Sequence, residues 1–385
     1  MPHAHDSPAV PPSRQLLLVG AGHAHLHVMS QRHRLGDIAV TLVDPGGFWY
    51  SGMANGVLGG RLSPVEDRLD PARLARRHGV RALRGRLADL DLAGRRAILA
   101  DGRTLPFDLL SLNLGSRTPI PPVRHPGPRV WGIKPIPCLV ALRRHLEAEF
   151  QRGADPRLVV VGGGASGVEV ACNLHALARR HGGRCSITLV TRGERLLEDA
   201  PRGASRWLAR LLASRGIRVI TATRVTGHAT GGALVRSDET LFGEDSLGLV
   251  EADHVIHAGG LVAPEVIERL GLPTLPGRGL AVEATLQSSG DRDIFAAGDC
   301  AAMVDHRLPR LGVYGVRQAP VLLGNLAARL AGQPLAAYEP QPRALAILDL
   351  GGGLGLAIRG QHWWGGRLAL HWKRWLDRRF MAGYR

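Results

Sequence analysis

The sequence predicts an α/β protein built from two doubly wound, three-layer domains, and two stretches of the chain carry this prediction. A continuous apolar strand at Gln15–Val19 is followed by a glycine turn, a helix and a second strand at Ile38–Val43. About 140 residues later the same order recurs, with strands at Arg157–Val161 and Ser186–Val190. Two such units indicate two domains, and 385 residues are enough for both.

The second glycine turn runs from Gly162 to Gly167 and has the GxGxxG spacing of a dinucleotide-binding turn. Gly162 permits the tight turn, Gly164 lets the backbone approach a pyrophosphate, and Gly167 lets the helix pack closely on the strand. The helix that begins here also offers unpaired N–H groups and a partial positive charge to phosphates. We therefore expect a Rossmann-like domain that binds a dinucleotide at these three glycines.

The first turn keeps Gly20 and Gly22 but has His25 where the third glycine is expected. A side chain there would widen the contact between helix and strand unless it points away, so an ordinary strand-to-helix turn is the alternative. Asp44 ends the next strand, 24 residues after Gly20, where a carboxylate accepts both hydroxyls of an adenosine ribose. Asp44 therefore favours a second dinucleotide site.

The segment Asp291–Ala301, which contains Gly298 and Asp299, resembles the second FAD fingerprint of the pyridine nucleotide-disulfide oxidoreductase superfamily. In that superfamily the acid equivalent to Asp299 holds the ribityl-pyrophosphate part of the flavin. The segment His257–Gly260 is similar to the junction where the chain returns to the FAD domain. The resemblance implies that the first turn serves FAD, that the Gly162 turn serves NADH or NADPH, and that the NAD(P)H domain is inserted in the FAD domain.

The expected organisation has four parts. Residues 1–13 form a disordered leader, residues 14–125 and 259–338 form the FAD domain, and residues 126–258 form the NAD(P)H domain. Residues 339–385 form a C-terminal region. The proline-rich segment Pro119–Pro137 is the expected connection between the domains, and an amphipathic helix is expected at Leu139–Phe150.

Four widely spaced cysteines, with no CxxC or CxxxxC pair, argue against a disulfide framework and a zinc site, and favour a reducing compartment. Disulfide reductases of the superfamily carry such a pair beside the flavin. What remains resembles the type II NADH dehydrogenases, which pass flavin electrons to a quinone without a redox disulfide. The cysteines are Cys138, Cys172, Cys185 and Cys300.

A closer likeness is to the oxidoreductase module found joined to selenide, water dikinase. It is carried by LLLVGAGHAHLHVM, by YSGM, by GVYGVRQAPVLLGNL and by DRRFMAGY. This likeness leaves the acceptor open, as a quinone or another small molecule. Two alternatives stay open as well: oxidation of sulfide or another chalcogenide through Cys138 or Cys300, and a non-enzymatic flavin-binding interaction module.

The resemblance also proposes residues that act on the substrates. Glu169 matches the acid that follows the glycine turn in type II dehydrogenases, close to the nicotinamide carboxamide; a solvated carboxylate is the alternative. Gln318 matches a region that in the same family lines the quinone pocket, with helix capping or packing as the alternative. Arg192 follows Thr191 at the end of a strand where NAD-selective enzymes have an acid, so we expect NADPH to be accepted.

The histidines of the first turn are not expected to form a metal site. Only His23 and His27 share a face of the helix, and no cysteine or carboxylate completes a ligand set. We expect His23 to pack against, or hydrogen-bond to, the flavin cofactor. Nucleic acid is not an expected partner, because the net charge of +16 comes almost wholly from arginines spread along the chain.

The C-terminal segment His362–Arg385 holds four of the seven tryptophans together with several basic residues. On a helix, Leu368, Trp372, Trp375 and Leu376 form one apolar stripe. Such a helix can lie in a membrane interface, and the alternatives are packing on the FAD domain or on the second subunit of a homodimer. The sequence has no signal-peptide or transmembrane pattern, so we expect a cytoplasmic protein with peripheral contact to the membrane.

Overall fold

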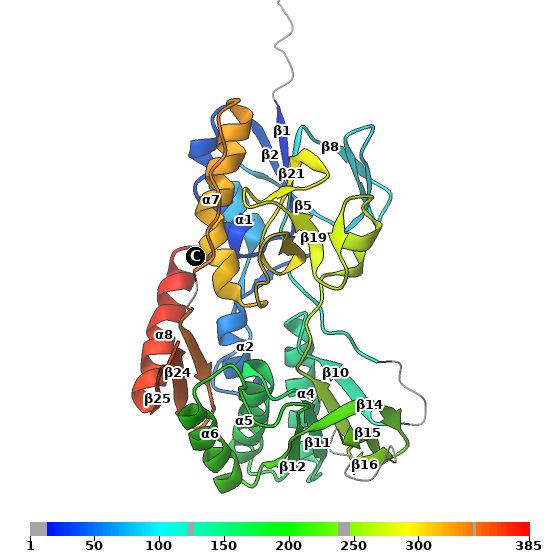
Figure 1. The fold of residues 1–385 in the computed structure, drawn as a ribbon, viewed down its shortest axis with the longest axis vertical. Coiled ribbons are helices and arrows are strands. Elements are labelled where there is room, and N and C mark those ends of the chain that lie inside the picture. Colours follow the sequence, from blue (N-terminus) through cyan, green and yellow to red (C-terminus); the bar gives the residue numbers. More distant parts are fainter. Residues whose placement is uncertain (1–13, 122–126, 238–246, 342–343) are drawn as a thin grey trace, which may run out of the picture.

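The computed structural model describes residues 14–121, 127–237, 247–341 and 344–385, and the expected leader lies outside them. It has two α/β lobes, the upper and lower parts of Figure 1, and a third unit at the C-terminal end that lies along their side. Strands from residues 15–112 and 274–303 build the first sheet, and strands from residues 129–257 build the second. The chain therefore leaves the first lobe and returns to it, as expected for an inserted domain.

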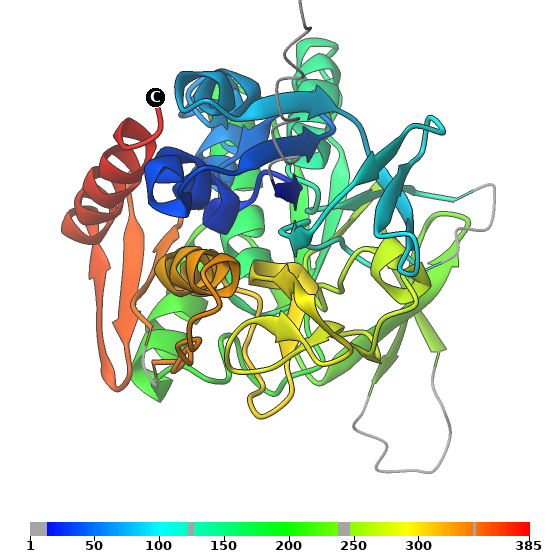
Figure 2. The same cartoon turned by 90° about the horizontal axis from the view of Figure 1, so that it is seen from above.

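The upper lobe is organised by a nine-stranded sheet in the order β18-β19-β20-β21-β9-β1-β2-β5, with β22 paired to β19. Its centre is parallel and largely apolar, because Leu16, Leu17 and Leu18 of β1 are buried, although Ser111 of the neighbouring strand is buried there as well. The helices α1 (His23–Ser30) and α7 (Gly312–Leu330) pack side by side against it (Figure 2). The main strands are β1 (Gln15–Val19), β2 (Ala39–Asp44), β5 (Arg81–Arg84), β9 (Leu109–Leu112) and β21 (Asp291–Ala296).

Shorter elements complete this lobe. The antiparallel sheet of β6 (Leu87–Asp91), β7 (Arg96–Leu99) and β8 (Thr104–Pro106) connects β5 to β9. The remaining elements are η1 (Arg32–Leu35), β3 (Phe48–Trp49), α2 (Ser51–Leu58), β4 (Arg68–Leu69), α3 (Pro71–Arg77), η2 (Glu265–Arg269), β18 (Thr274–Leu275), β19 (Gly279–Val282), β20 (Gln287–Ser288), η3 (Gly298–Cys300) and β22 (Ala301–Met303).

The lower lobe is built on a parallel five-stranded sheet in the order β10-β17-β11-β12-β13. Helices cover one face, and an antiparallel sheet packs on the other through Val159, Val190, Ala233 and Val255. The sheet strands are β10 (Arg129–Gly132), β11 (Arg157–Val161), β12 (Ser186–Val190), β13 (Arg218–Ile220) and β17 (His254–His257). The helices are α4 (Pro137–Gln151), α5 (Ala165–Arg180) and α6 (Arg202–Ser214), and the antiparallel strands are β14 (Thr223–Ala229), β15 (Gly232–Ser237) and β16 (Leu247–Glu251).

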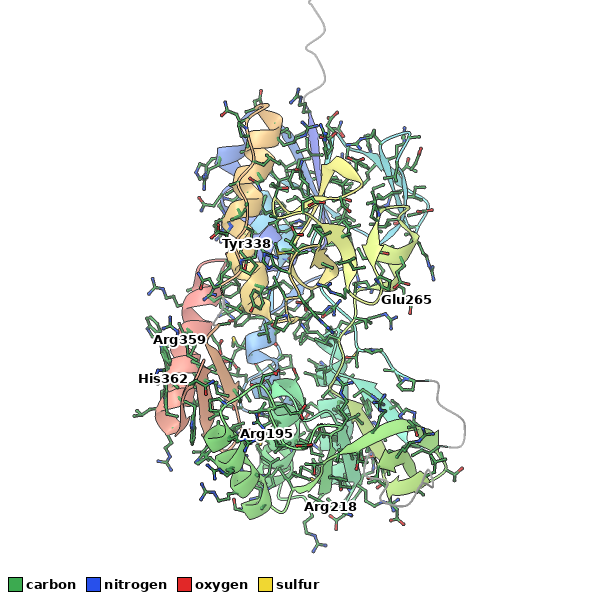
Figure 3. All side chains as sticks on the ribbon, in the orientation of Figure 1. Arg195, Arg218, Glu265, Tyr338, Arg359 and His362 are labelled. Atoms are coloured by element: carbon green, nitrogen blue, oxygen red, sulfur yellow. The ribbon has the colours of Figure 1, made fainter. Side chains whose placement is uncertain are left out.

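The C-terminal unit contains a sheet that the sequence analysis does not anticipate. The antiparallel strands β23 (Ala346–Asp349), β24 (Gly355–Arg359) and β25 (His362–Gly366) carry the helix α8 (Arg367–Ala382). Arg359 and His362 flank the turn between β24 and β25 at the outer edge of the molecule (Figure 3). In the described part of the chain, no helix has both the length and the apolar character needed to cross a membrane.

His25 does not point away from the contact between α1 and the sheet. Its side chain is fully buried, with Nδ1 2.5 Å from the Gly20 carbonyl oxygen and Nε2 2.8 Å from Ser111 Oγ. Because a carbonyl only accepts, Nδ1 carries the proton and Nε2 accepts from the Ser111 hydroxyl. At the position expected for the third glycine the imidazole is therefore buried and hydrogen-bonded, and these bonds link the turn to β9.

We predict that His25 makes folding sensitive to acid. Burial lowers the pKa of His25 to about 4 from an ordinary 6.5. Above pH 6.5 neither state binds the proton, whereas between that pH and about 4 only the unfolded chain does, so stability falls as the pH falls through this window. Urea unfolding at several pH values should show a weaker pH dependence for His25→Asn than for the parent. An unchanged dependence would contradict this role for His25.

Candidate functional site

The Gly162 turn has the geometry of a dinucleotide-binding turn. Gly162 has a φ of +122°, and a Cβ on Gly167 would lie 1.8 Å from the Gly162 carbonyl oxygen. No side chain fits at Gly167, so the start of α5 packs directly on the end of β11. A Cβ on Gly164, by contrast, would have no atom within 4 Å. The open space at Gly164 is where a pyrophosphate can approach the backbone.

Thr191 and Arg192 follow β12, at the position where the adenosine ribose of the nicotinamide nucleotide is expected. Thr191 is buried, and its hydroxyl accepts a hydrogen bond from Gly193 N at 3.2 Å. Arg192 is exposed and has no ion-pair partner within the described ranges. Its guanidinium is therefore available to a ligand.

Asn113, which the sequence does not point to, packs directly against both glycines of the first turn. A Cβ on Gly20 would lie 2.6 Å from the Asn113 carbonyl oxygen, and one on Gly22 would lie 2.3 Å from its Oδ1. Asn113 Oδ1 accepts from Ala24 N and His25 N, while its Nδ2 donates to Ala297 O at 2.6 Å. One side chain thus joins the start of α1 to the Gly298 turn.

Asp44 lies at the end of β2 as expected. Its Oδ2 accepts from Ala21 N at 3.1 Å, and its Oδ1 accepts from Gly46 N at 2.8 Å and Gly47 N at 2.9 Å. These bonds fix the carboxylate beside the first turn. Each carboxylate oxygen can accept two hydrogen bonds, so Oδ2 can still accept one from a ribose hydroxyl.

The turn at Gly298 and Asp299 lies next to the first turn. Asp299 Oδ2 accepts from Ser116 Oγ at 2.7 Å, and Gly298, with a φ of +72°, donates its N–H to Gln318 Oε1 at 2.7 Å. Gln318 is buried in α7 and so positions this turn. Its expected contact with a quinone stays a prediction.

His23 and Lys134 face the space between these turns. His23 Nε2 is buried and has no hydrogen-bond partner among the described residues, and burial, with Lys134 nearby, lowers the pKa of His23 to about 4. Lys134, which precedes Pro135 in the connection between the lobes, was not predicted as a site residue. Burial lowers its pKa, while the charge of Asp299 acts in the opposite direction. A partly buried lysine beside an imidazole whose buried nitrogen has no partner is unusual unless a ligand completes the group.

Aromatic rings from the first lobe and from α8 line one side of this space. The His23 ring contacts Phe48, Tyr50 and Phe380, with centroid distances of 5.1, 5.7 and 5.4 Å. Tyr50 stacks on Phe380 at 4.5 Å. Phe380 belongs to α8, so the C-terminal unit forms part of the wall.

A buried polar cluster lies behind these rings and joins both lobes to α8. Lys373 Nζ donates to Asp377 Oδ2 at 2.9 Å and to the Gly52 carbonyl oxygen. Glu169 accepts from Asp349 N at 2.7 Å, and burial raises the pKa of Glu169 to about 7, although the Lys373 charge lowers it. Burial also raises the pKa of Asp67 to about 8. Of these six residues, only Glu169 was predicted as a site residue from the sequence.

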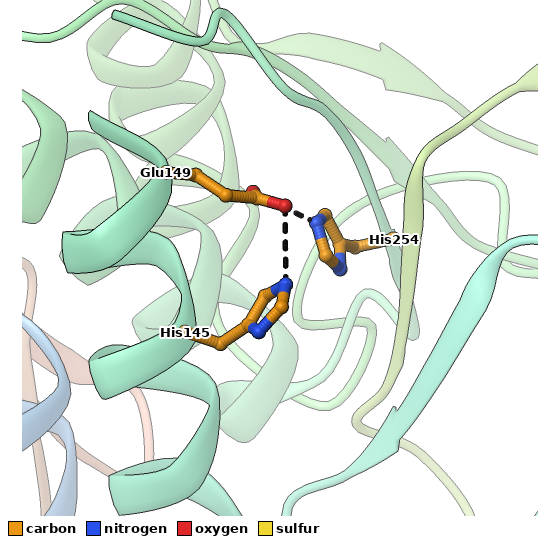
Figure 4. A group of neighbouring side chains, drawn as sticks. All are labelled: His145, Glu149 and His254. Carbon is orange, nitrogen blue, oxygen red and sulfur yellow. Dashed lines mark hydrogen bonds and ion pairs between the residues drawn. The ribbon is translucent and has the colours of Figure 1, made fainter. Parts of the chain in front are cut away.

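A group of two histidines and a glutamate that the sequence does not single out lies in the lower lobe. His145 and Glu149 of α4 lie beside His254 of β17, and both histidine Nε2 atoms are 3.0–3.1 Å from Glu149 (Figure 4). Trp131 Nε1 donates to His254 Nδ1 at 3.1 Å, so His254 Nε2 carries the proton. In that tautomer His254 cannot bind a metal through Nε2, and the group instead ties α4 to the sheet.

Comparison with known proteins gives a family and a relative. Residues 14–319 match the family described as pyridine nucleotide-disulphide oxidoreductase. The demethylphylloquinone reductase NdbB of Synechocystis sp. is 31% identical over 268 residues, which are 67% of this chain and 64% of that protein. The match therefore spans less than two thirds of the relative's length.

Two solved structures share the fold. The sulfide:quinone oxidoreductase of Aquifex aeolicus has a TM-score of 0.80 at 17% identity, covering 97% of this chain and 92% of that one. NDH2 of Plasmodium falciparum has a TM-score of 0.78 at 14% identity, covering 97% of each chain. The likeness shows the same two-lobed α/β architecture.

We predict that two glycines of the same turn respond differently to alanine. Gly167→Ala should destabilise the protein by about 1–3 kcal/mol, because its Cβ meets the Gly162 carbonyl oxygen. Gly164→Ala should leave stability nearly unchanged but weaken binding of a nicotinamide nucleotide, because its Cβ enters the open space. Chemical denaturation and nucleotide titration measure the two effects. Equal loss of stability in both variants would contradict this assignment.

Proposed function

Because the chain belongs to the pyridine nucleotide-disulphide oxidoreductase family, we propose that it is an FAD-dependent NAD(P)H dehydrogenase. NAD(P)H gives a hydride to FAD, and the electrons pass on to a quinone-type acceptor without a redox disulfide. One observation carries this proposal. The buried Lys373 donates to the carbonyl oxygen of Gly52, two residues after Tyr50, and its charge acts on Glu169 in the first turn of α5. Tyr50 contacts His23, so one lysine lies near residues of both expected nucleotide sites.

The residues of the first lobe fit an FAD. Gly20 and Gly22 keep the backbone clear, Asp44 offers an acceptor to a ribose, and Asp299 offers a carboxylate near the first turn. The unpartnered His23 Nε2 supplies a further polar contact. When bound, FAD supplies the two-electron acceptor that links a nicotinamide to a quinone.

The buried acids suit the proton uptake that accompanies reduction of a quinone. The pKa values of Glu169 and Asp67 are raised by burial to about 7 and about 8. Both carboxyl groups can therefore hold a proton near neutral pH, the range in which a general acid is effective. Lys373, between Glu169 and Asp377, favours the ionised form of Glu169 and limits the rise in its pKa.

The cysteines give less support to chalcogenide oxidation. Cys300, the cysteine next to Asp299, is fully buried, and burial raises the pKa of its thiol to about 11. Cys138 is half-buried at the start of α4, and its pKa is also raised by burial. Both thiols stay protonated at neutral pH, whereas attack on a sulfur species needs a thiolate.

The outward face of α8 supports peripheral contact with a membrane. Leu368, Trp372 and Trp375 are 79%, 37% and 54% exposed, whereas Lys373 and Asp377 point inward. These three side chains of the stripe are therefore accessible, whereas Leu376 is partly buried and lines a hollow together with His27 and Ser30 of α1. An exposed face of tryptophan and leucine flanked by arginines suits the headgroup region of a bilayer, where a long-tailed quinone is dissolved.

The first prediction of this proposal concerns the flavin. The purified protein should show a flavin spectrum that NADH bleaches without oxygen and that a soluble quinone then restores. The double variant Cys138→Ala/Cys300→Ala should keep this cycle, because no thiol takes part. Loss of NADH-dependent bleaching only in the variant would favour the chalcogenide alternative, and a flavin that NADH never bleaches would favour the interaction module.

A second prediction concerns the nucleotide. The exposed Arg192 can form two hydrogen bonds to a 2′-phosphate, and Thr191 cannot repel it. We expect kcat/KM with NADPH to equal or exceed that with NADH, and Arg192→Ala to lower the NADPH value by about tenfold while changing the NADH value little. A strong preference for NADH that Arg192→Ala does not alter would argue decisively against this role.

A third prediction concerns α8. Truncation before β25 would remove buried residues of the C-terminal unit, so point variants of the exposed face test it better. Leu368→Gln/Trp375→Gln should lose binding to vesicles and activity with long-tailed quinones, because both side chains leave the interface. Flavin content and activity with soluble quinones should stay. Intact vesicle binding together with a change in oligomeric mass would identify the stripe as a subunit interface instead.

A further inference from the structure

A cavity on one flank of α8 has an excess of positive charge. It has a volume of about 280 Å³ and lies between α8 and the segment from Met53 to Glu66. This volume is close to the lower end of the range of about 300–1,000 Å³ typical of ligand pockets. Its charged lining consists of four arginines against two acids: Arg61, Arg374, Arg378, Arg385, Glu66 and Asp377.

Both acids are already engaged within the protein. Glu66 Oε2 accepts from Ser63 N at 2.7 Å, and Asp377 Oδ2 accepts from Lys373 Nζ at 2.9 Å. Among the arginines, Arg61 pairs with Asp349 at 2.8 Å. Arg374 and Arg378 form no ion pair with a carboxylate in the parts of the chain that the structure describes. Glu66 keeps its charge, because Ser63 N is neutral, so Arg374, Arg378 and Arg385 face one remaining acid and the cavity keeps an excess of positive charge.

The guanidinium groups also keep free donors. Arg61 Nε and Arg374 Nε are buried and have no hydrogen-bond partner among the described residues. Buried donors without partners are costly, and neighbouring like charges repel each other. Burial and the charge of Arg61 both lower the pKa of Arg374, while the charge of Asp349 raises it, so the two guanidinium groups repel each other. An anion with several oxygen atoms would satisfy the donors and reduce the repulsion.

We propose that this cavity, named here the α8 arginine pocket, binds a phosphate group. Guanidinium groups match the oxygens of a phosphate in two-point fashion, which favours phosphate over a simple halide. The phosphate belongs either to the headgroup of an anionic phospholipid or to a free phosphate compound. The lipid source rests on the proposed membrane contact of α8, and the free phosphate does not.

The position of the pocket on the helix fits a headgroup. Arg374 and Arg378 are on one flank of α8, whereas Leu368 and Trp375 are on the outward face next to it. If the outward face lies in the interface, the mouth of the pocket is at the depth of the lipid phosphates. One helix then supplies both the apolar contact and the contact with the headgroup.

The test compares two double variants that remove the same charge from α8. Arg374→Gln/Arg378→Gln changes the pocket, and Arg367→Gln/Arg379→Gln changes exposed arginines that do not line it. Each protein is titrated, as flavin-loaded full chain, with phosphatidylcholine vesicles with and without phosphatidylglycerol at one ionic strength. Each is also heated in inorganic phosphate and in chloride of equal ionic strength.

The lipid source predicts that the pocket variant loses affinity for phosphatidylglycerol vesicles by about tenfold more than the control variant. The free-phosphate source predicts that phosphate raises the melting temperature of the parent and the control, but not of the pocket variant. Either result supports the pocket. Identical behaviour of the two double variants with both probes, or a parent that responds to neither, overturns it.

Two further measurements separate failure of the pocket from other failures. If Arg374→Gln unfolds the protein, the single variant Arg378→Gln, which changes an exposed side chain, is compared with Arg379→Gln. The variant Leu368→Gln/Trp375→Gln tests membrane contact itself. If that variant binds vesicles like the parent while the pocket variant loses its preference for phosphatidylglycerol, the proposed membrane contact of the apolar face is wrong. The proposal for the α8 arginine pocket is then supported on its own.

Discussion

The structure depends on one constraint that occurs twice: a helix must begin directly where a buried strand ends, with almost no room for a side chain at the contact between them. In the lower lobe Gly167 solves this by having no side chain, because a Cβ would lie 1.8 Å from the Gly162 carbonyl oxygen. In the upper lobe His25 solves it by bonding Gly20 O and Ser111. The second solution places a polar ring in the core, so it requires both hydrogen bonds. The same backbone geometry is thus reached in the lower lobe by a residue without a side chain and in the upper lobe by a hydrogen-bonded histidine.

The C-terminal helix departs from the usual arrangement of an amphipathic helix, because it buries two charged side chains beside Leu370 and Met381 and exposes large apolar ones. Its buried side carries Lys373 and Asp377, whose side chains are 9% and 8% exposed, and its outer side carries leucine and tryptophan. Removing two charges from water costs several kcal/mol per ion, so the pair needs partners to be kept. Gly52 O supplies one further acceptor to Lys373. The helix is therefore held by these polar contacts together with the buried Leu370 and Met381, while Leu368 and Trp375 stay exposed on its outer side.

The sequence predicts those parts of the fold whose signals are local. The strands β1, β11 and β12 have the predicted bounds because their apolar runs are bounded by turns, and β2 begins and ends one residue later than predicted. The sheet β23 to β25 was missed because its glycine-rich sequence has little alternation. Site residues such as Asn113 were missed for a different reason. Asn113 caps α1 from 89 residues away, and no spacing in the sequence records such a contact.

The two faces of α8 connect events that are distant from one another. Phe380 touches His23 beside the expected flavin site, and Lys373 acts on Glu169 beside the expected nicotinamide site. The opposite face carries Leu368 and Trp375, and the flank carries Arg374 and Arg378. The backbone hydrogen bonds of an α-helix keep it rigid, so a displacement of one side also displaces the other. A ligand on the outer side of α8 that shifts the helix must therefore also shift Lys373 and Phe380, and with them the charge near Glu169 and the wall of the expected flavin site.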